Sequence, residues 1–383
     1  MFCDWRVAEC VYSDTFLADN YNEVPLYKTI EQLKRSTLKQ KPFHFEEGDK
    51  APERPPSQDI WQAALQNRKF KTVVICIICR ILSNTYKPPR RPAALVIDFV
   101  NVLNIEFTHY KDTRQTIDTF KPMGEGDVKF MRHAVMFGSL MVESVDSDVL
   151  LIAMRFVSAH NFEIQIFVKR IASKSIDDDA PPPDKDKKRK REKKKTEYEI
   201  IDVQQMLCML HGCFRQAVGS ELCVTPQQMT DILVFQMLLS GSDFSRKMPQ
   251  LGAKFIWESL HISAPLILMC LQDSEGELSV DEDNVADMVL VELYKAKYPK
   301  YVRDEPESFD DVYSDLQSSK LSEKTRASLP DRTHVLCTIR NIQWIINYWS
   351  LNNKSPATHT DGRDGFVVRN NKLDFGIAAE EPV

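Results

Sequence analysis

Apolar and polar residues alternate along this chain with the period of a helix in some segments and of a strand in others. Helical spacing followed by a short β-branched run is the rhythm of a β-α-β unit. The segments with this rhythm are a helix over 58–86, a strand over 93–100, a helix over 124–137, a strand over 140–145, an apolar helix over 149–156 and an alternating strand over 162–169. The pattern therefore predicts two successive units.

A helix over 229–239 has the clearest start signal in the sequence. Thr225-Pro226-Gln227-Gln228 has the form of a capping box with proline in the first helical position. The remaining expected elements are a strand over 198–201, a helix over 203–210, helices after residue 260 with one apolar face over 335–349, and, nearer the N-terminus, a strand over 6–12, a helix over 26–38 and a loop over 41–57.

Alternating strands and helices predict an α/β fold with a central, mostly parallel sheet flanked by helices. In such folds, sites lie beyond the carboxyl ends of the strands. We expect one domain over 1–260, a helical C-terminal region over 261–350 and a polar, loosely ordered tail over 351–383. Residues 173–196 pass from aspartates and prolines into a basic run, a composition that predicts a disordered insertion.

The charge of the chain is unevenly distributed. Its formal net charge is −5 over 383 residues, yet 185–195 holds nine basic residues against two acidic ones, so the rest is markedly acidic. No stretch has the roughly 18 apolar residues of a membrane span, and the N-terminus lacks the apolar core of a signal peptide. We expect a reduced, intracellular protein in which Cys76, Cys79 and His211 are buried in helices rather than bound to zinc.

Acidic residues occur at four places where an apolar run ends or a predicted helix begins. They are Asp98, the pair Glu125 and Asp127, the pair Asp146 and Asp148, and Asp243. Carboxylates at close range repel one another unless something neutralises them, most simply divalent cations. The pattern predicts a metal-dependent phosphodiester nuclease, with solvated helix caps and turn acids as the alternative.

Taken in order, these motifs resemble those of the flap endonuclease and XPG-like 5′ nucleases of the PIN-like superfamily, from about residue 66 to 260. Leu95-Val96-Ile97-Asp98 is similar to the strand with that family's second metal-site aspartate, and Gly124-Glu125-Gly126-Asp127 to its G-E-x-E pair, with Asp in place of the second Glu. Val145-Asp146-Ser147-Asp148 resembles its paired aspartates, and Gly241-Ser242-Asp243-Phe244 its G-x-D-[YF] element.

The resemblance implies a PIN-like nuclease domain over 1–260 that works with two Mg²⁺ ions, for which Mn²⁺ can substitute. The catalytic and metal-binding residues it implies are Asp98, Glu125, Asp127, Asp146, Asp148 and Asp243. The family's first aspartate has only a poor counterpart here, Asp14, after Val11-Tyr12-Ser13.

The elements that would bind substrate depart further from the family pattern. Residues 244–260 resemble the family's helix-two-turn-helix, whose turn binds duplex phosphates, but only Gly252 and Lys254 of the usual residues are kept. A plain helix–helix turn is the alternative. The family's long basic arch cannot fit in the 26 residues between Asp98 and Glu125, where Lys111 and Arg114 are the candidate phosphate contacts.

These features predict a divergent, monomeric 5′ nuclease acting on flap, branched or single-stranded nucleic acid, with DNA favoured over RNA and no membrane partner. The alternative is a catalytically inactive PIN-like scaffold that binds nucleic acid or protein. The basic residues Lys187, Lys188, Arg189, Lys190 and Arg191 predict nuclear localisation or an electrostatic tether to nucleic acid, against a merely solvated linker.

Overall fold

The computed structural model describes a mixed α/β protein. The residues it describes are 2–6, 12–17, 64, 68–87, 93–98, 102–107, 112–117, 126–144, 146–171, 197–219, 224–245, 247–272, 277–350, 366–369 and 372–375. The helix predicted over 26–38, the loop over 41–57 and the insertion over 173–196 lie outside these ranges.

The main sheet has eight strands in the order β5-β4-β3-β2-β1-β6-β7-β8 within the described ranges. Their bounds are β1 Phe2–Arg6, β2 Tyr12–Leu17, β3 Ala93–Asp98, β4 Val102–Phe107, β5 Asp112–Ile117, β6 Ser139–Glu143, β7 Gln165–Ile171 and β8 Tyr198–Asp202. Among the described strands of this sheet, only the β2–β3 and β6–β7 pairings are parallel. The prediction of a mostly parallel sheet was therefore wrong, and the sheet is mixed.

The main cause is the stretch after Asp98, where sequence reasoning expected no strands. Leu103-Asn104-Ile105-Glu106-Phe107 alternates as a strand should, and β3, β4 and β5 follow one another with only a few residues between them. Such short connections can join antiparallel neighbours but not parallel ones. Near the N-terminus, residues 7–11 of the strand predicted over 6–12 lie outside the described residues, and β1 and β2 on either side pair antiparallel with Arg6 opposite Tyr12.

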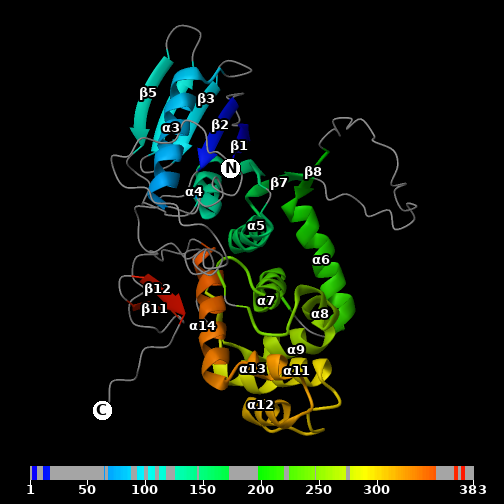
Figure 1. Ribbon diagram of the computed structural model, residues 1–383. Coiled ribbons are helices and arrows are strands. Elements are labelled where there is room, and N and C mark those ends of the chain that lie inside the picture. The colour runs from blue at the N-terminus through cyan, green and yellow to red at the C-terminus, as the bar shows by residue number, and fades with distance from the viewer. Residues whose placement is uncertain are drawn as a thin grey trace, which may run out of the picture.

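Helices make up most of the remaining described residues. They are α3 Arg68–Thr85, α4 Gly126–Phe137, α5 Asp148–Ala159, α6 Val203–Val218, α7 Pro226–Leu239, α8 Ala253–Glu258, α9 Leu260–Cys270, α10 Glu282–Asn284, the π-helix η1 Val285–Leu290, α11 Val291–Lys297, α12 Phe309–Ser318, α13 Glu323–Ala327 and α14 Arg332–Tyr348. Figure 1 shows the sheet with α3 and α4 in the upper part of the molecule and α7 to α14 in the lower part.

Most of the predicted helices are confirmed, including the one with the capping box. Thr225 Oγ1 accepts a hydrogen bond from the Gln228 amide at 3.1 Å, and Gln228 Oε1 accepts one from the Thr225 amide at 3.0 Å. Two short hairpins complete the described part, β9 Leu271–Gln272 with β10 Ser279–Val280, and β11 Phe366–Arg369 with β12 Lys372–Phe375. The second hairpin lies within the tail that is expected to be loosely ordered, and the rest of that tail lies outside the described residues.

The cysteine predictions were right about the helices and only partly right about burial. Cys76 is exposed on α3, whereas Cys79 is half-buried and packs against the small apolar cluster that includes Leu95 and Ile97. His211 is buried in α6, and its Nε2 lies 2.9 Å from Thr230 Oγ1. Burial lowers the pKa of His211, so it is a neutral packing residue at pH 7.

One hydrophobic core runs from the sheet into the C-terminal helices. It contains residues from Val128 of α4 to Trp349, directly after α14. The Phe244 and Trp349 rings meet edge to face, with centroids 5.5 Å apart, and both residues are almost fully buried. Because apolar contacts continue across residue 260, the helical C-terminal region is packed onto the helices before it.

A buried guanidinium adds a polar link within this core. Arg155 of α5 is fully buried, its Nη1 lies 3.1 Å from Asp231 Oδ1 of α7, and its Nε donates to the Ile346 carbonyl of α14 at 3.3 Å. An isolated buried charge is very costly, so the three helices depend on one another for its neutralisation.

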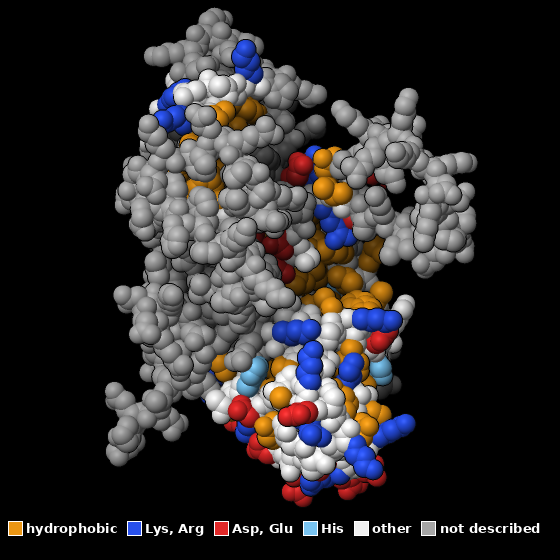
Figure 2. All heavy atoms as spheres, in the orientation of Figure 1, with side chains coloured by type: hydrophobic (Ala, Val, Ile, Leu, Met, Phe, Trp, Pro, Cys, Tyr) orange, Lys and Arg blue, Asp and Glu red, His pale blue; other side chains and the backbone are white. Residues whose placement is uncertain are grey.

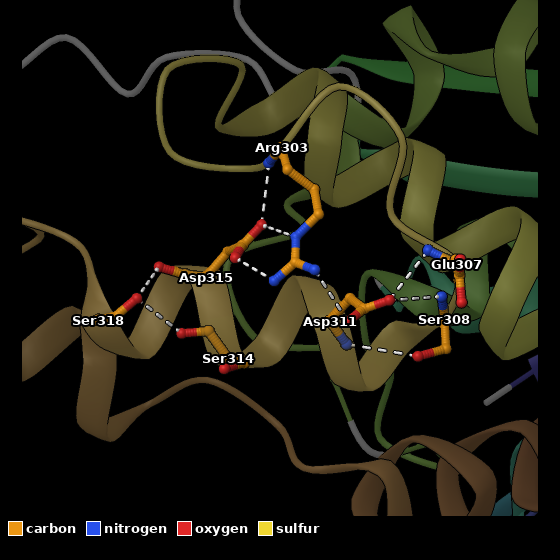
Figure 3. Close-up of polar contacts among 7 residues, drawn as sticks. All are labelled: Arg303, Glu307, Ser308, Asp311, Ser314, Asp315 and Ser318. Carbon is orange, nitrogen blue, oxygen red and sulfur yellow. Dashed lines mark hydrogen bonds and ion pairs between the residues drawn. The ribbon is translucent and has the colours of Figure 1, made fainter.

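On the surface of the C-terminal region, Arg303 fixes the start of α12 (Figure 3). Its Nη2 and Nε donate to Asp315 at 2.7 and 2.9 Å, and its Nη1 donates to Asp311 at 3.1 Å. The other oxygen of Asp311 accepts from the Glu307 and Ser308 amides, which completes a capping box.

Within the described residues, no helix is both long and apolar enough to cross a membrane.

Candidate functional site

Three of the predicted site residues meet at the start of α5. Asp146 Oδ1 accepts a hydrogen bond from the Asp148 amide at 3.0 Å, and Asp148 Oδ2 accepts one from the Asp243 amide at 2.8 Å. Asp148 is 8% exposed, while Asp146 and Asp243 are half-buried. Two motifs that are 95 positions apart in the sequence are therefore in direct contact.

The turn that carries Asp243 is held by backbone and hydroxyl groups. After α7, Gly241 adopts φ +93°, a backbone conformation that residues with a side chain rarely adopt. Ser242 Oγ then accepts from the amides of Phe244 and Ser245, each at 3.0 Å. With Phe244 buried against Trp349, the position of Asp243 is set from both sides.

Asp98 has a different environment from these three acids. It is 1% exposed, and its side chain points to the face of the sheet that α4 covers. Lys129 Nζ lies 3.3 Å from Oδ1, while Arg132 Nε donates to Oδ2 at 3.0 Å and His133 Nε2 lies 2.8 Å from the same oxygen. Its charge is thus already balanced by side chains of α4.

The pKa values agree with this ion-pair role. Burial alone would raise the pKa of Asp98, but the hydrogen bond with His133 and the charges of Lys129 and Arg132 together hold it well below its usual range. Burial lowers the pKa of His133, so its ring is neutral at pH 7. Two cations facing one carboxylate do not suit the binding of a further divalent cation at Asp98.

Strand register also separates Asp98 from the acidic cluster. Ile97, Phe16, Phe2 and Glu143 are successive partners across β3, β2, β1 and β6. Three strand spacings of about 4.8 Å place the ends of β3 and β6 roughly 14 Å apart. Two metal ions that act together are only about 4 Å apart, so the structure does not bring Asp98 into one compact site with Asp146 and Asp148.

The other predicted acids are placed less fully. Asp127 lies in the first turn of α4 and is half-buried. Asp14 lies on β2 opposite Leu95, three residues before the end of β3, and its side chain is outside the described residues, as is all of Glu125. Within the described part of the chain, no group of three or more His, Cys, Asp or Glu side chains is arranged to hold a metal ion.

A basic pocket lies beyond the turn that carries Asp243. It has a volume of 570 Å³, and it is lined by Lys247, Lys254 and Lys297 and by one acid, Glu258, which lies 3.8 Å from Lys254 Nζ. Lys254 lies on α8, whose N-cap is Gly252, and its side chain is 89% exposed. Lys297 of α11 lies over the Phe255 ring, 4.7 Å from its centroid.

Sequence reasoning found part of this pocket and missed the rest. Gly252 and Lys254 were predicted, whereas Lys297 comes from a distant helix and had no signal in the sequence. Lys247 is only four residues after Asp243 and could have been included. Figure 2 shows acidic side chains set back in the middle of this face and Lys and Arg side chains below them.

The two candidate phosphate contacts between Asp98 and Glu125 have different outcomes. Arg114 lies on β5, and its Nη2 donates to the Ser83 carbonyl of α3 at 2.8 Å. Its guanidinium therefore ties the edge strand to the helix above it. Lys111 lies outside the described residues, as do Lys187, Lys188, Arg189, Lys190 and Arg191.

No protein-family model matches this chain, and no curated protein matches it either.

Proposed function

We propose that this protein is a divergent metal-dependent 5′ nuclease with a PIN-like fold of the flap endonuclease and XPG type. The observation that carries the proposal is the contact of Asp148 with the Asp243 amide, with Asp146 bonded to the Asp148 amide beside them. Acids from two separate motifs, in the order that this family uses, meet at the carboxyl end of a strand that has a parallel neighbour.

Asp146, Asp148 and Asp243, together with Asp127, would contribute ligands to a divalent cation whose coordination also requires Glu125, because the acids of the described part of the chain are not by themselves arranged to hold one. Carboxylate oxygens are the ligands that Mg²⁺ prefers. When bound, the metal would stabilise charge on the attacking and leaving oxygens of a phosphodiester. Asp98 does not belong to this set, because Lys129 and Arg132 already neutralise it.

The residues around the cluster would position the nucleic acid. Lys247, Lys254 and Lys297 would contact phosphates near the Asp243 turn, with phosphate competing against Glu258 for the exposed amine of Lys254. Gly241 and Ser242 fix the turn between this basic pocket and the acids. The same strand of nucleic acid could thus contact both sites.

The proposal is tested by incubating purified protein with 5′-flap, single-stranded DNA and RNA substrates in Mg²⁺ or Mn²⁺. We expect metal-dependent cleavage by the wild type, strongly reduced by Asp148→Asn and unchanged by Asp304→Asn. Asp304 is an exposed aspartate of the C-terminal region and provides a matched control. Cleavage that survives in Asp148→Asn would point to a contaminating nuclease and would refute the assignment.

One observation favours a second candidate, an inactive PIN-like scaffold that binds nucleic acid. Asp98 is expected to be a metal ligand, but its carboxylate is neutralised by Lys129 and Arg132. Such an ion pair stabilises the fold and does not bind a metal ion. A wild type that binds these substrates with metal present, yet cleaves none of them, would support the scaffold.

We also propose nuclear accumulation driven by Lys187, Lys188, Arg189, Lys190 and Arg191. Dense basic runs of this kind act as nuclear import signals. The measurement is the distribution of a fluorescently tagged protein with and without alanine at these five positions. An unchanged distribution would remove the assignment.

A further inference from the structure

The basic pocket beside the Asp243 turn carries an excess of positive charge. Its three lysines come from three elements, with Lys247 on the turn, Lys254 on α8 and Lys297 at the end of α11, and Figure 1 labels both helices in the lower part of the molecule. Together with the acid Glu258, the charged side chains of the lining have a net charge of +2. The pocket therefore attracts an anion with about two negative charges.

The amines of these lysines can bind a ligand at little cost. Within the part of the chain that the structure describes, neither Lys247 nor Lys297 has an acidic partner, and the Lys297 amine lies 4.7 Å from the centroid of the Phe255 ring. Lys254 pairs with Glu258 at 3.8 Å, but the two side chains are 89 and 59% exposed. Water screens so exposed a pair, so a phosphate group can displace Glu258 from the Lys254 amine.

The turn that forms one wall of the pocket is held in place by the C-terminal helices. Gln250 lines the pocket and adopts φ +66°, a left-handed conformation that is uncommon for residues other than glycine. Its Nε2 donates to Ser328 Oγ at 2.8 Å, and the carbonyl of the preceding Pro249 accepts from the Tyr294 hydroxyl at 2.6 Å. These contacts maintain an otherwise unfavourable backbone, so the wall is formed before a ligand binds.

The pocket adjoins the acidic cluster. Gly241 and Lys247 pack so closely that a Cβ added to Gly241 would lie 2.7 Å from the Cβ of Lys247, and Asp243 lies on the turn between them. The Asp243 amide donates to Asp148 at 2.8 Å. A strand of nucleic acid whose end is bound in the pocket therefore has its first phosphodiester bonds near these acids.

Charge and size favour a phosphate at the end of a strand over one within it. A phosphodiester carries one negative charge, whereas a phosphate monoester carries about 1.5 to 2 at pH 7. Because Coulomb energy is proportional to charge, the lysines attract the end group up to about twice as strongly. The volume of 570 Å³ lies within the range of about 300–1,000 Å³ for small-molecule sites, and it suits one terminal nucleotide rather than a length of duplex.

We propose that this pocket binds the 5′-phosphate at the end of a nucleic-acid strand, with Lys247, Lys254 and Lys297 as the residues that contact it. The binding of a terminal phosphate rests on the pocket, whereas the choice of the 5′ end rests on the proposed function. The substrate is then a 5′-phosphorylated strand, and a strand with a 5′-hydroxyl binds less tightly.

The test is fluorescence anisotropy in EDTA, which prevents metal-dependent cleavage, with one internally labelled single-stranded DNA that carries a 5′-phosphate, a 3′-phosphate or hydroxyls at both ends. We expect the 5′-phosphorylated strand to bind roughly 3- to 30-fold more tightly than the hydroxyl strand, the gain from a few exposed ion pairs. Equal affinity for these two strands would overturn the proposal. Equal affinity for the 5′- and 3′-phosphorylated strands would overturn the choice of the 5′ end.

Matched variants assign the preference to the pocket. The double variant Lys247→Gln with Lys297→Gln should lose it, whereas Lys320→Gln, at an exposed lysine outside the pocket, should keep it. Glu258→Gln should strengthen it, because the acid that competes with phosphate is removed, and a merely structural role of Glu258 would give no such gain. A preference that survives in the double variant would overturn the proposal. Melting curves establish that each variant is folded.

Two further comparisons separate the ligands and the two proposals. Thymidine monophosphate that binds as tightly as the 5′-phosphorylated strand would make this a mononucleotide site and overturn the assignment to a strand end. A wild type that prefers the 5′-phosphorylated strand in EDTA, yet cleaves nothing in Mg²⁺, would support the pocket and contradict only the nuclease. Cleavage in Mg²⁺ without any preference between the end groups would support the nuclease and overturn only the pocket.

Discussion

Substitution of Asp98 by asparagine tests whether Asp98 is a buried ion-pair partner or a metal ligand. The two roles predict different changes in the free energy of unfolding. In the structure, Asp98 neutralises Lys129, which is fully buried, and Arg132, which is 10% exposed. Removing one partner of a buried ion pair costs about 3–5 kcal/mol, because the remaining charge is uncompensated. A metal ligand would behave differently, since relieving carboxylate repulsion in metal-free protein leaves stability unchanged or raises it.

The assay is thermal and urea unfolding of wild type and Asp98→Asn in EDTA at pH 7. A loss of this size lowers the Tm by roughly 4–6 °C for a chain of this length. The double variant Asp98→Asn with Lys129→Met should recover part of the loss, because an apolar side chain of similar volume needs no partner. The reasoning is refuted if Asp98→Asn is as stable as wild type in EDTA and is stabilised less by Mg²⁺.

The loss of stability caused by Asp98→Asn should also depend on pH, and it should become smaller in acid. The folded-state pKa of Asp98 lies below its usual value of about 3.9. The ionised carboxylate therefore contributes its full stabilisation at pH values above the usual pKa. This stabilisation is lost as the pH falls toward the folded-state pKa. The difference in unfolding free energy between wild type and Asp98→Asn should narrow below about pH 4.

Three further substitutions test the local structure. Thr225→Ala removes one half of the capping box and should cost about 1 kcal/mol in urea unfolding, whereas Thr225→Ser should retain it. Gly241→Ala should be destabilising by about 1 kcal/mol or more, because φ of Gly241 is +93° and the added Cβ would lie 2.7 Å from the Cβ of Lys247. An unchanged Tm of this variant would contradict the prediction. Arg303→Ala should lower stability at pH 7, and the deficit should shrink as pH falls below about 4, because Arg303 holds the pKa of Asp315 below its usual value. A deficit that is constant with pH would exclude that ion pair as its cause.

Much of the helical framework could be predicted from the sequence because its signals are local. The capping box at Thr225 and the apolar period of the following helix depend only on neighbouring residues. The strands after Asp98 were missed for a different reason. Leu103 to Phe107 alternates over too few residues to stand out, and the family resemblance places an arch rather than strands in that stretch.

The acidic residues illustrate what depends on tertiary structure. The proximity of Asp148 and Asp243 followed from the order of motifs, but the role of Asp98 did not. Lys129, Arg132 and His133 are spaced three and one apart on a predicted helix, so they share one face, and that face was a readable sign of a buried anion opposite. Nothing in the sequence could show that this anion is Asp98, since the pairing depends on which sheet face α4 covers.

The buried guanidinium of Arg155 determines how much of the chain must fold together. It lies on α5, which begins with Asp148, it pairs with Asp231 of α7, which leads to Asp243, and it donates to the carbonyl of Ile346 in α14. A fragment ending near residue 260 would keep both acidic motifs and lose a hydrogen-bond acceptor for this charge, together with the Trp349 ring behind Phe244. We therefore expect the part of the chain that carries the acidic motifs to fold together with the C-terminal helices, so that loss of α14 would destabilise the turn of Asp243 without altering any residue in it.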